Sequence, residues 1–170
     1  MMELVKFEDF PKLEDIHQVS LKDPIKIFKI CQEMEFLCES KNYKNLSAVQ
    51  IGNPLDLFIV KSDGNLPFVE KGKYGYFANT TYKATDKKQI VSLEGCPSIR
   101  SQDGQLRFFQ VDRYYNVKIV GKLLCVKDKI IKFVDFDVEM NSSQGIIFQQ
   151  KIDLSSCVTI SNKGREIFVW

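Results

Sequence analysis

Histidine, a common metal ligand and catalytic base, occurs once in the chain of 170 residues, as His17. A metal centre built on histidine ligands needs several of them, and this sequence does not supply them. A cysteine–histidine catalytic pair is excluded in the same way unless His17 is the base. The residues around it, 14–18, are mostly polar, so we expect His17 to lie on the surface.

An excess of one charge sign and long apolar runs are also missing. The balance of 24 Lys and Arg against 22 Asp and Glu gives no electrostatic reason to expect nucleic acid or an anionic membrane as a partner. No apolar run is long enough to span a membrane, and the first residues lack the apolar region of a signal peptide. We therefore expect a chain that is cytoplasmic at synthesis.

Paired cysteine spacings are missing as well. The chain has 5 cysteines, an odd number, and no CxxC pattern. Cysteines of this kind are read as reduced thiols that mostly fill the core rather than as a disulfide framework.

What is present suits a single folded domain. A hydrophobic fraction of 44% with 13 Phe is enough for a core. Asp23 before Pro24 predicts the start of an amphipathic helix over residues 24–40, and residues 141–143 predict the cap of a second helix that runs through Ile152. Strands are predicted at 57–60, 74–82, 89–93, 107–120, 123–126, 134–140, 157–160 and 167–170. This order indicates an α+β fold with mostly antiparallel pairing.

Three short motifs give the sequence its most specific pattern. They are LSAVQIG at residues 46–52, EGCPS at residues 94–98 and QQKIDL at residues 149–154. In this order and over residues 24–162, they resemble the three motifs of the peptide deformylase family, G-φ-G-L-A-A-P-Q-φ-G, E-G-C-L-S and Q-H-E-x-D-H. The resemblance implies the deformylase fold, with antiparallel sheets around a central C-terminal helix. We expect this domain at 23–170, preceded by an N-terminal arm at 1–22.

The first two motifs keep the residues that matter most in the family. Gln50 falls on the glutamine that stabilises the oxyanion, and Cys96 falls on the cysteine that ligates the metal. The position after that cysteine is Pro97 instead of Leu. Since proline has no backbone N–H, it removes a donor at a point where the family's substrate pairs with the enzyme.

The third motif departs from the family at the positions that do chemistry. The two metal-ligating histidines, one helical turn apart, have become Gln150 and Leu154, and the general-base glutamate has become Lys151. Gln149 and Asp153 are kept, which supports the register of the alignment.

These substitutions predict a degenerate former site made of Gln50, Cys96, Gln150, Lys151 and Leu154. One thiolate and one amide are too few ligands for a divalent metal, and a lysine cation would repel the metal and cannot take a proton from water. We expect Leu154 to fill the vacated space and the glutamines to bond to one another and to backbone. The sequence therefore predicts a pseudoenzyme with no catalytic residues, no metal and no cofactor.

The function predicted on this basis is that of a structural or interaction subunit of a larger assembly. Its partners would be other protein subunits, with no nucleic acid and no membrane. By analogy with reused enzyme folds, the assembly is predicted to be a bacteriophage virion, as a tail or baseplate component. The aromatic C-terminus, residues 168–170, and the arm are the candidate contact segments.

Two alternatives stay open. The first is a module that binds a peptide N-terminus or another small ligand in the old cleft, against which Pro97 and Leu154 count. The second is a reactive thiol at Cys96, whose pKa a nearby Lys151 ammonium would lower.

Overall fold

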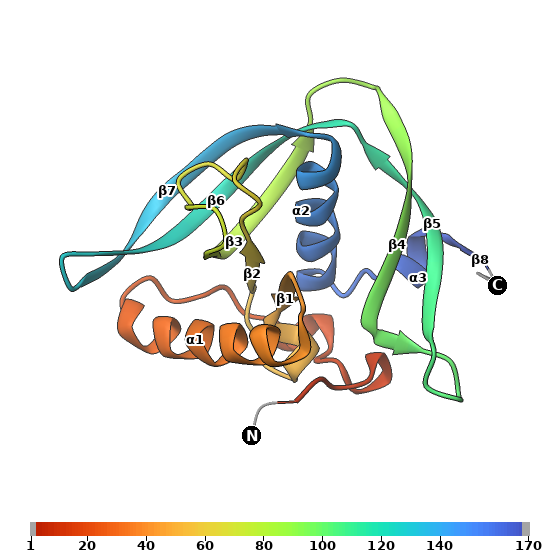
Figure 1. Cartoon of the computed structure of the whole chain (residues 1–170), viewed down its shortest axis with the longest axis horizontal. Coiled ribbons are helices and arrows are strands. Elements are labelled where there is room, and N and C mark those ends of the chain that lie inside the picture. Colours follow the sequence, from red (N-terminus) through yellow and green to blue (C-terminus); the bar gives the residue numbers. More distant parts are fainter. Residues whose placement is uncertain (1–2, 168–170) are drawn as a thin grey trace.

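The protein, described here by a computed structural model over residues 3–167, has two antiparallel sheets on either side of one central helix (Figure 1). The helices are α1 (Pro24–Lys41), α2 (Ser142–Ser155) and α3 (Ile160–Lys163), with single 3-10 turns η1 (Phe7–Asp9), η2 (Leu13–Asp15) and η3 (Ala48–Ile51). The strands are β1 (Asn45–Ser47), β2 (Leu57–Lys61), β3 (Tyr74–Ala84), β4 (Gln89–Arg100), β5 (Leu106–Tyr114), β6 (Asn116–Lys127), β7 (Ile130–Asn141) and β8 (Arg165–Ile167). The α+β prediction with mostly antiparallel pairing is confirmed.

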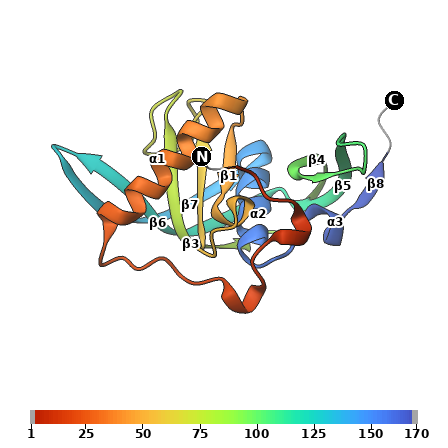
Figure 2. The same ribbon diagram turned by 90° about the horizontal axis from the view of Figure 1, so that it is seen from below.

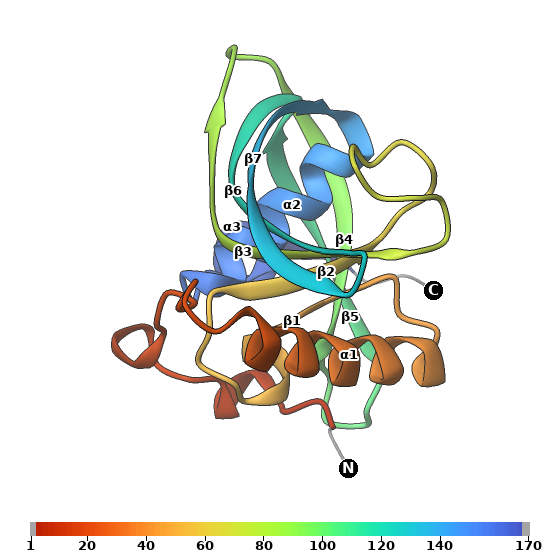
Figure 3. The ribbon, with the colours of Figure 1, turned by 90° about the vertical axis from the view of Figure 1, so that its left-hand side faces the viewer.

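The larger sheet wraps around α2. Its strand order is β1-β2-β3-β6-β7, and β6 pairs with β7 along its whole length, from Asn116 opposite Asn141 to Lys127 opposite Ile130. Seen from the side, this sheet curves around the central helix (Figure 3). The smaller sheet has the order β4-β5-β8 and lies on the other side of α2, together with α3 (Figure 1).

Aromatic side chains join α2 to the larger sheet. The Phe148 ring of α2 lies 5.3 Å from the ring of Phe58, 4.8 Å from Phe77 and 6.0 Å from Phe136. All four are fully buried, so they form the centre of the apolar contact that seats the helix in the curved sheet.

Helix α1 begins and ends as its sequence predicts. The Asp23 side chain accepts a hydrogen bond from the Lys26 backbone N–H at 3.0 Å, and Pro24 occupies the first helical position. Asn42 ends the helix in the left-handed conformation, with φ of 56°. The face with Cys31 and Met34 is buried, and the helix crosses the molecule beneath the larger sheet (Figure 2).

Most predicted elements are confirmed, with four corrections. The strand predicted at 107–120 is divided at Tyr115, which separates β5 from β6. The piece predicted as a separate strand at 123–126 belongs to β6, and β4 continues through the second motif instead of ending before it. The strand predicted at 157–160 is wrong. Thr159 is instead the N-cap residue of the short helix α3, and its backbone N–H donates to Asn162 Oδ1 at 2.9 Å, which is the reciprocal bond of a capping box. Residues 168–170 lie outside the described part of the chain.

The arm packs against the domain. The Val5 N–H donates to Gln50 O at 2.9 Å, and Phe7 packs against the buried cluster of the smaller sheet. His17 is exposed, as predicted, and its backbone bonds to residues Pro54 and Asp56. The boundary between arm and domain at residue 22 stays a prediction. Within residues 3–167, none of the helices is long and apolar enough to cross a membrane.

Candidate functional site

Helix α2 is fixed against β5 by the two motif residues that the family also keeps. Gln149 Nε2 donates to Tyr114 O at 2.9 Å, and the Tyr114 N–H donates to Gln149 Oε1 at 3.1 Å. One turn later, Asp153 accepts from Arg113 Nη1. These contacts set which side of the helix faces the smaller sheet, and so they place residues 150, 151 and 154.

A buried ion network supports this arrangement. Arg113 is 2% exposed and donates through Nε to Glu94 Oε1 at 2.7 Å and through Nη2 to Glu94 Oε2 at 2.8 Å. Burial alone would lower the pKa of Arg113, but its bonds to Glu94 and Asp153 outweigh burial and raise that pKa. Asp153 also accepts from Lys163 Nζ at 2.9 Å, which ties α3 to α2. The sequence reasoning did not find this network, because its members lie far apart in the chain.

Gln50 connects the three walls of the former site. It stands on η3, is 0% exposed, and its Oε1 accepts from the Ser47 N–H and from Lys151 Nζ, each at 3.0 Å. These two donors fix the carbonyl end of the amide, so its Nε2 faces Cys96 Sγ on β4 at 3.5 Å. The structure therefore brings Gln50, Cys96 and Lys151 together, as the motifs predicted.

Lys151 is the unusual member of this group. It is 1% exposed, and burial lowers the pKa of its amine, while Cys96, Cys38 and Glu94 act to raise it. One of the two alternatives left open by the sequence has this amine act on the Cys96 thiol. In the structure, Lys151 Nζ donates to Gln50 Oε1 instead. The Cys96 thiol contacts the other side of the same amide, at Gln50 Nε2.

The two positions that carry the family's histidines have separate roles. Gln150 Nε2 donates to Gly95 O on β4 at 3.5 Å, which agrees with the predicted bond to backbone. The predicted bond between the two glutamines is wrong, because Gln50 already has partners in Ser47, Lys151 and Cys96. Leu154 is 2% exposed, in keeping with its expected role as a filler.

The residues at the metal positions of the family do not fit a divalent ion. They offer one thiol at Cys96, one amide at Gln150 that is bonded to Gly95, and a hydrocarbon side chain at Leu154, where a catalytic site needs three protein ligands. In the part of the chain that the structure covers, no group of three or more His, Cys, Asp or Glu could hold a metal ion. We therefore derive no chemistry through a metal here.

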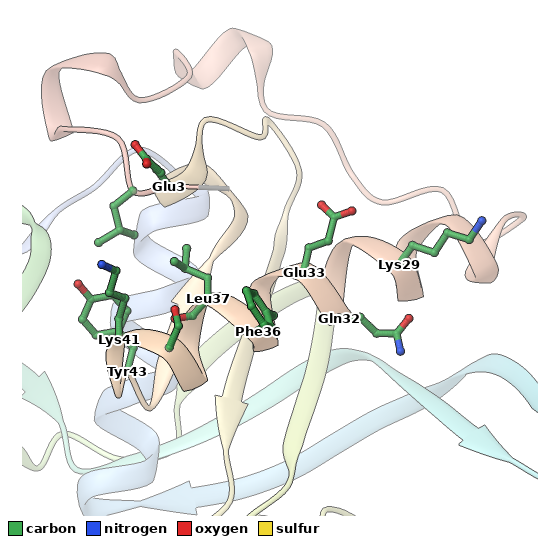
Figure 4. Close-up of a pocket in the computed structure, with 10 residues that line it drawn as sticks. Glu3, Lys29, Gln32, Glu33, Phe36, Leu37, Lys41 and Tyr43 are labelled. Atoms are coloured by element: carbon green, nitrogen blue, oxygen red, sulfur yellow. The ribbon is translucent and has the colours of Figure 1, made fainter. Parts of the chain in front are cut away.

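Four hollows of the described surface are lined by residues other than Gln50, Cys96, Gln150, Lys151 and Leu154, and one of the four borders the second motif at Pro97 and Ser98. The largest, of about 1220 Å³, runs along the outer side of α1 beside the start of the arm (Figure 4). We call it the α1 hollow. Phe36, which is 73% exposed, lines it together with Leu37, Tyr43 and charged residues such as Lys29 and Glu33.

Comparisons with known proteins agree on one family. The family described as polypeptide deformylase matches residues 2–167. A solved structure of peptide deformylase 1B of Arabidopsis thaliana is 21% identical, has a TM-score of 0.73, and is matched over 95% of this chain and 80% of that one. A probable peptide deformylase from Synechococcus phage S-SSM7 is 14% identical with a TM-score of 0.72, over 96% and 99% of the two chains. No curated protein sequence matches.

These findings correct one expectation from the sequence. A chain that is not an enzyme was predicted, but the family that matches nearly the whole chain is an enzyme family. The similar structures carry enzyme names too, including a peptide deformylase from Synechococcus elongatus in complex with actinonin, which is 15% identical with a TM-score of 0.73, over 96% of this chain and 79% of that one. The prediction was wrong because it inferred the class of the whole protein from three substituted positions.

Proposed function

The chain belongs to the polypeptide deformylase family, and within that family we propose that it serves as a protein-binding subunit of a larger assembly. The observation that carries the proposal is the contrast between the interior and the surface. At the family's site, Gln50 and Cys96 are closed off, at 0% and 2% exposure. The largest of the four hollows lies instead on α1, with Phe36 exposed in it.

The α1 hollow has the composition of a protein contact site. An exposed aromatic residue with apolar neighbours and a charged rim is the usual arrangement of a contact that buries one anchor side chain. Phe36, Leu37 and Tyr43 supply the apolar part, and Lys29 and Glu33 lie on the rim (Figure 4). A hollow of about 1220 Å³ has room for side chains of a partner.

Crosslinking of the native protein in its source tests the proposal. We expect crosslinks from the lysines of the α1 hollow, Lys29 and Lys41, to a second protein that also co-purifies with the chain. A Phe36→Ser variant should lose most of this partner. Phe68→Ser is the matched control, because Phe68 is 79% exposed but lies outside the α1 hollow. Equal recovery of the partner with both variants, or a chain that purifies alone, would contradict the proposal.

We also propose a bacteriophage virion, at its tail or baseplate, as the assembly. Its support is that a similar structure comes from a phage protein and matches this chain over 99% of that protein's length. Immunoblotting of purified virions with an antibody against the chain tests this, and a signal is expected in the particles. A signal confined to the lysate supernatant would rule it out.

The alternative roles in the old cleft have less support. A peptide N-terminus or a reagent directed at Cys96 would have to enter a region whose side chains already contact one another. Isothermal titration with a methionyl peptide separates this alternative from the surface role, and we expect no heat of binding.

A further inference from the structure

We propose that the side-chain amine of Lys151 replaces the metal ion of the family as the group that ties the walls of this site together. The proposal concerns the interior of the domain and goes beyond the protein-binding role of its surface. The residues at the family's metal positions do not fit a metal ion in this chain. Cys96, Gln150 and Leu154 do not supply the three protein ligands that a divalent ion needs, yet the segments that carry them remain packed together, with Cys96 and Leu154 each 2% exposed.

Through Gln50, Lys151 joins α2 to β4, the two elements on which the family's metal ligands lie. Its Nζ reaches from α2 to Gln50 Oε1 on η3 at 3.0 Å, across 101 positions of the sequence. Gln50 then reaches from η3 to Cys96 Sγ on β4 at 3.5 Å. A continuous line of hydrogen bonds therefore runs from α2 through η3 to the cysteine that the family uses as a ligand.

Gln50 passes this contact on to Cys96 because its side-chain amide cannot flip by 180° without losing hydrogen bonds. Oε1 accepts from Lys151 Nζ and from the Ser47 N–H, while Nε2 donates to Cys96. A flipped amide would set its NH₂ group against two donors, and a buried donor without an acceptor is costly. Lys151 thus fixes the orientation of Gln50, and through it the contact with Cys96.

The tether works in either protonation state of the amine. Both an ammonium and a neutral amine have N–H groups to donate to Gln50 Oε1. Glu94 belongs to the ion network with Arg113, so the nearest carboxylate on β4 is already paired. Since the amine is part of the chain, the walls are joined on folding without a bound ion.

Cobalt binding tests the proposal on the unmodified protein. Co²⁺ bound to a cysteine thiolate gives a charge-transfer absorption band, and we expect no such band from Cys96 in the wild-type chain. The triple variant Gln150→His, Lys151→Glu, Leu154→His removes the tether and supplies the family's ligands, and it should show the band. A band in the wild type that disappears with Cys96→Ala overturns the proposal. So does a triple variant without a band, because the walls would then not stand at the spacing of a metal site.

A single substitution tests the tether itself. Lys151→Met keeps the length of the side chain and removes the amine, so Gln50 loses one of its two fixed donors. We expect alkylation of Cys96 by iodoacetamide in the native protein, followed by peptide mass spectrometry, to become about tenfold faster because the wall opens more often. Lys122→Met is the control, since Lys122 pairs with Asp135 on the larger sheet. Equal rates in the two variants overturn the proposal, and if Lys151→Met does not fold, the cobalt experiment on the wild type decides.

Discussion

The Arg113 guanidinium holds both carboxylate oxygens of Glu94, at 2.7 and 2.8 Å, in the interior of the protein. Removing one partner of such a buried pair leaves the other charge without compensation. We predict that Arg113→Leu lowers the free energy of unfolding by about 3–5 kcal/mol, measured by urea denaturation.

The same strand offers a control for this prediction. Arg107 also lies on β5 and binds a carboxylate, that of Glu166, but their side chains are 37% and 31% exposed. Arg107→Leu should cost less than about 1 kcal/mol, because water screens an exposed pair. Similar losses in the two variants would mean that burial of the Arg113 network does not matter.

A second prediction concerns Asn79, which joins the arm to β3. Its side chain accepts from the Val19 N–H at 2.7 Å and donates to Val19 O at 3.0 Å, while its own backbone is left-handed, with φ of 52°. Asn79→Gly loses the two hydrogen bonds but keeps the backbone relaxed, and we expect a cost of about 1–3 kcal/mol. Asn79→Ala should cost about 1 kcal/mol more, because alanine is strained at this φ. Thermal unfolding of both variants measures the difference, and equal stability would show that the backbone conformation is not the constraint.

A third prediction concerns the aromatic cluster that seats α2. Phe148→Ala should lower the free energy of unfolding by about 3–5 kcal/mol, since it opens a cavity among fully buried rings. Phe36→Ala is the control, because a 73% exposed residue on α1 loses little on truncation, within about 0.5 kcal/mol. A small effect at Phe148, measured by chemical denaturation, would mean that the larger sheet repacks around the helix.

A fourth prediction concerns acid. The hydrogen bond from Arg107 lowers the pKa of Glu166 below that of an ordinary glutamate. A carboxylate with a lowered pKa stabilises the fold above its unfolded pKa, and this contribution is lost as the pH falls through the folded pKa. We therefore expect the amide signals of β8 in NMR spectra to hold from neutral pH down to the unfolded pKa and to change below it. Glu166→Gln should remove this acid transition, and a transition that persists in the variant would assign it to another group.

A fifth prediction concerns the thiols. Burial raises the pKa of Cys38 to about 12, and Cys31 and Cys38 are both fully buried on α1. Cys125 and Cys157 are only partly buried. In native protein near neutral pH, alkylation followed by peptide mapping should modify Cys125 and Cys157 well before the two cysteines of α1. Early modification of Cys31 or Cys38 would show that α1 separates from the sheet.

The sequence predicted the elements that depend on local signals. Asp23 and Pro24 marked the start of α1, and the alternation over 134–140 marked β7, because capping and strand periodicity are properties of neighbouring residues. It also predicted which side chains meet at the former site, since the family motifs carry that long-range information. The error at 157–160 has a local cause too, because the capping potential of Thr159 outweighs the β propensity of its neighbours.

Long-range pairing of polar groups was not predictable in the same way. Glu94, Arg113 and Asp153 are each ordinary charged residues in the sequence, and only the packing of β4, β5 and α2 brings them together. The bond between Lys151 and Gln50 was missed for a similar reason. The two residues lie 101 positions apart, and no local pattern shows that a lysine has turned inward.

Neighbouring positions of helix α2 have different roles: some attach the helix to β5, and others face the former site. This separation affects how such a domain can evolve. Gln149 and Asp153 hold the helix to β5, whereas residues 150, 151 and 154 face the former site. Substitutions at the second set therefore leave the attachment of the helix intact. The chemistry of this helix can be exchanged at three positions while its attachment to β5 is kept, and a designer can use the same three positions to install a new ligand set.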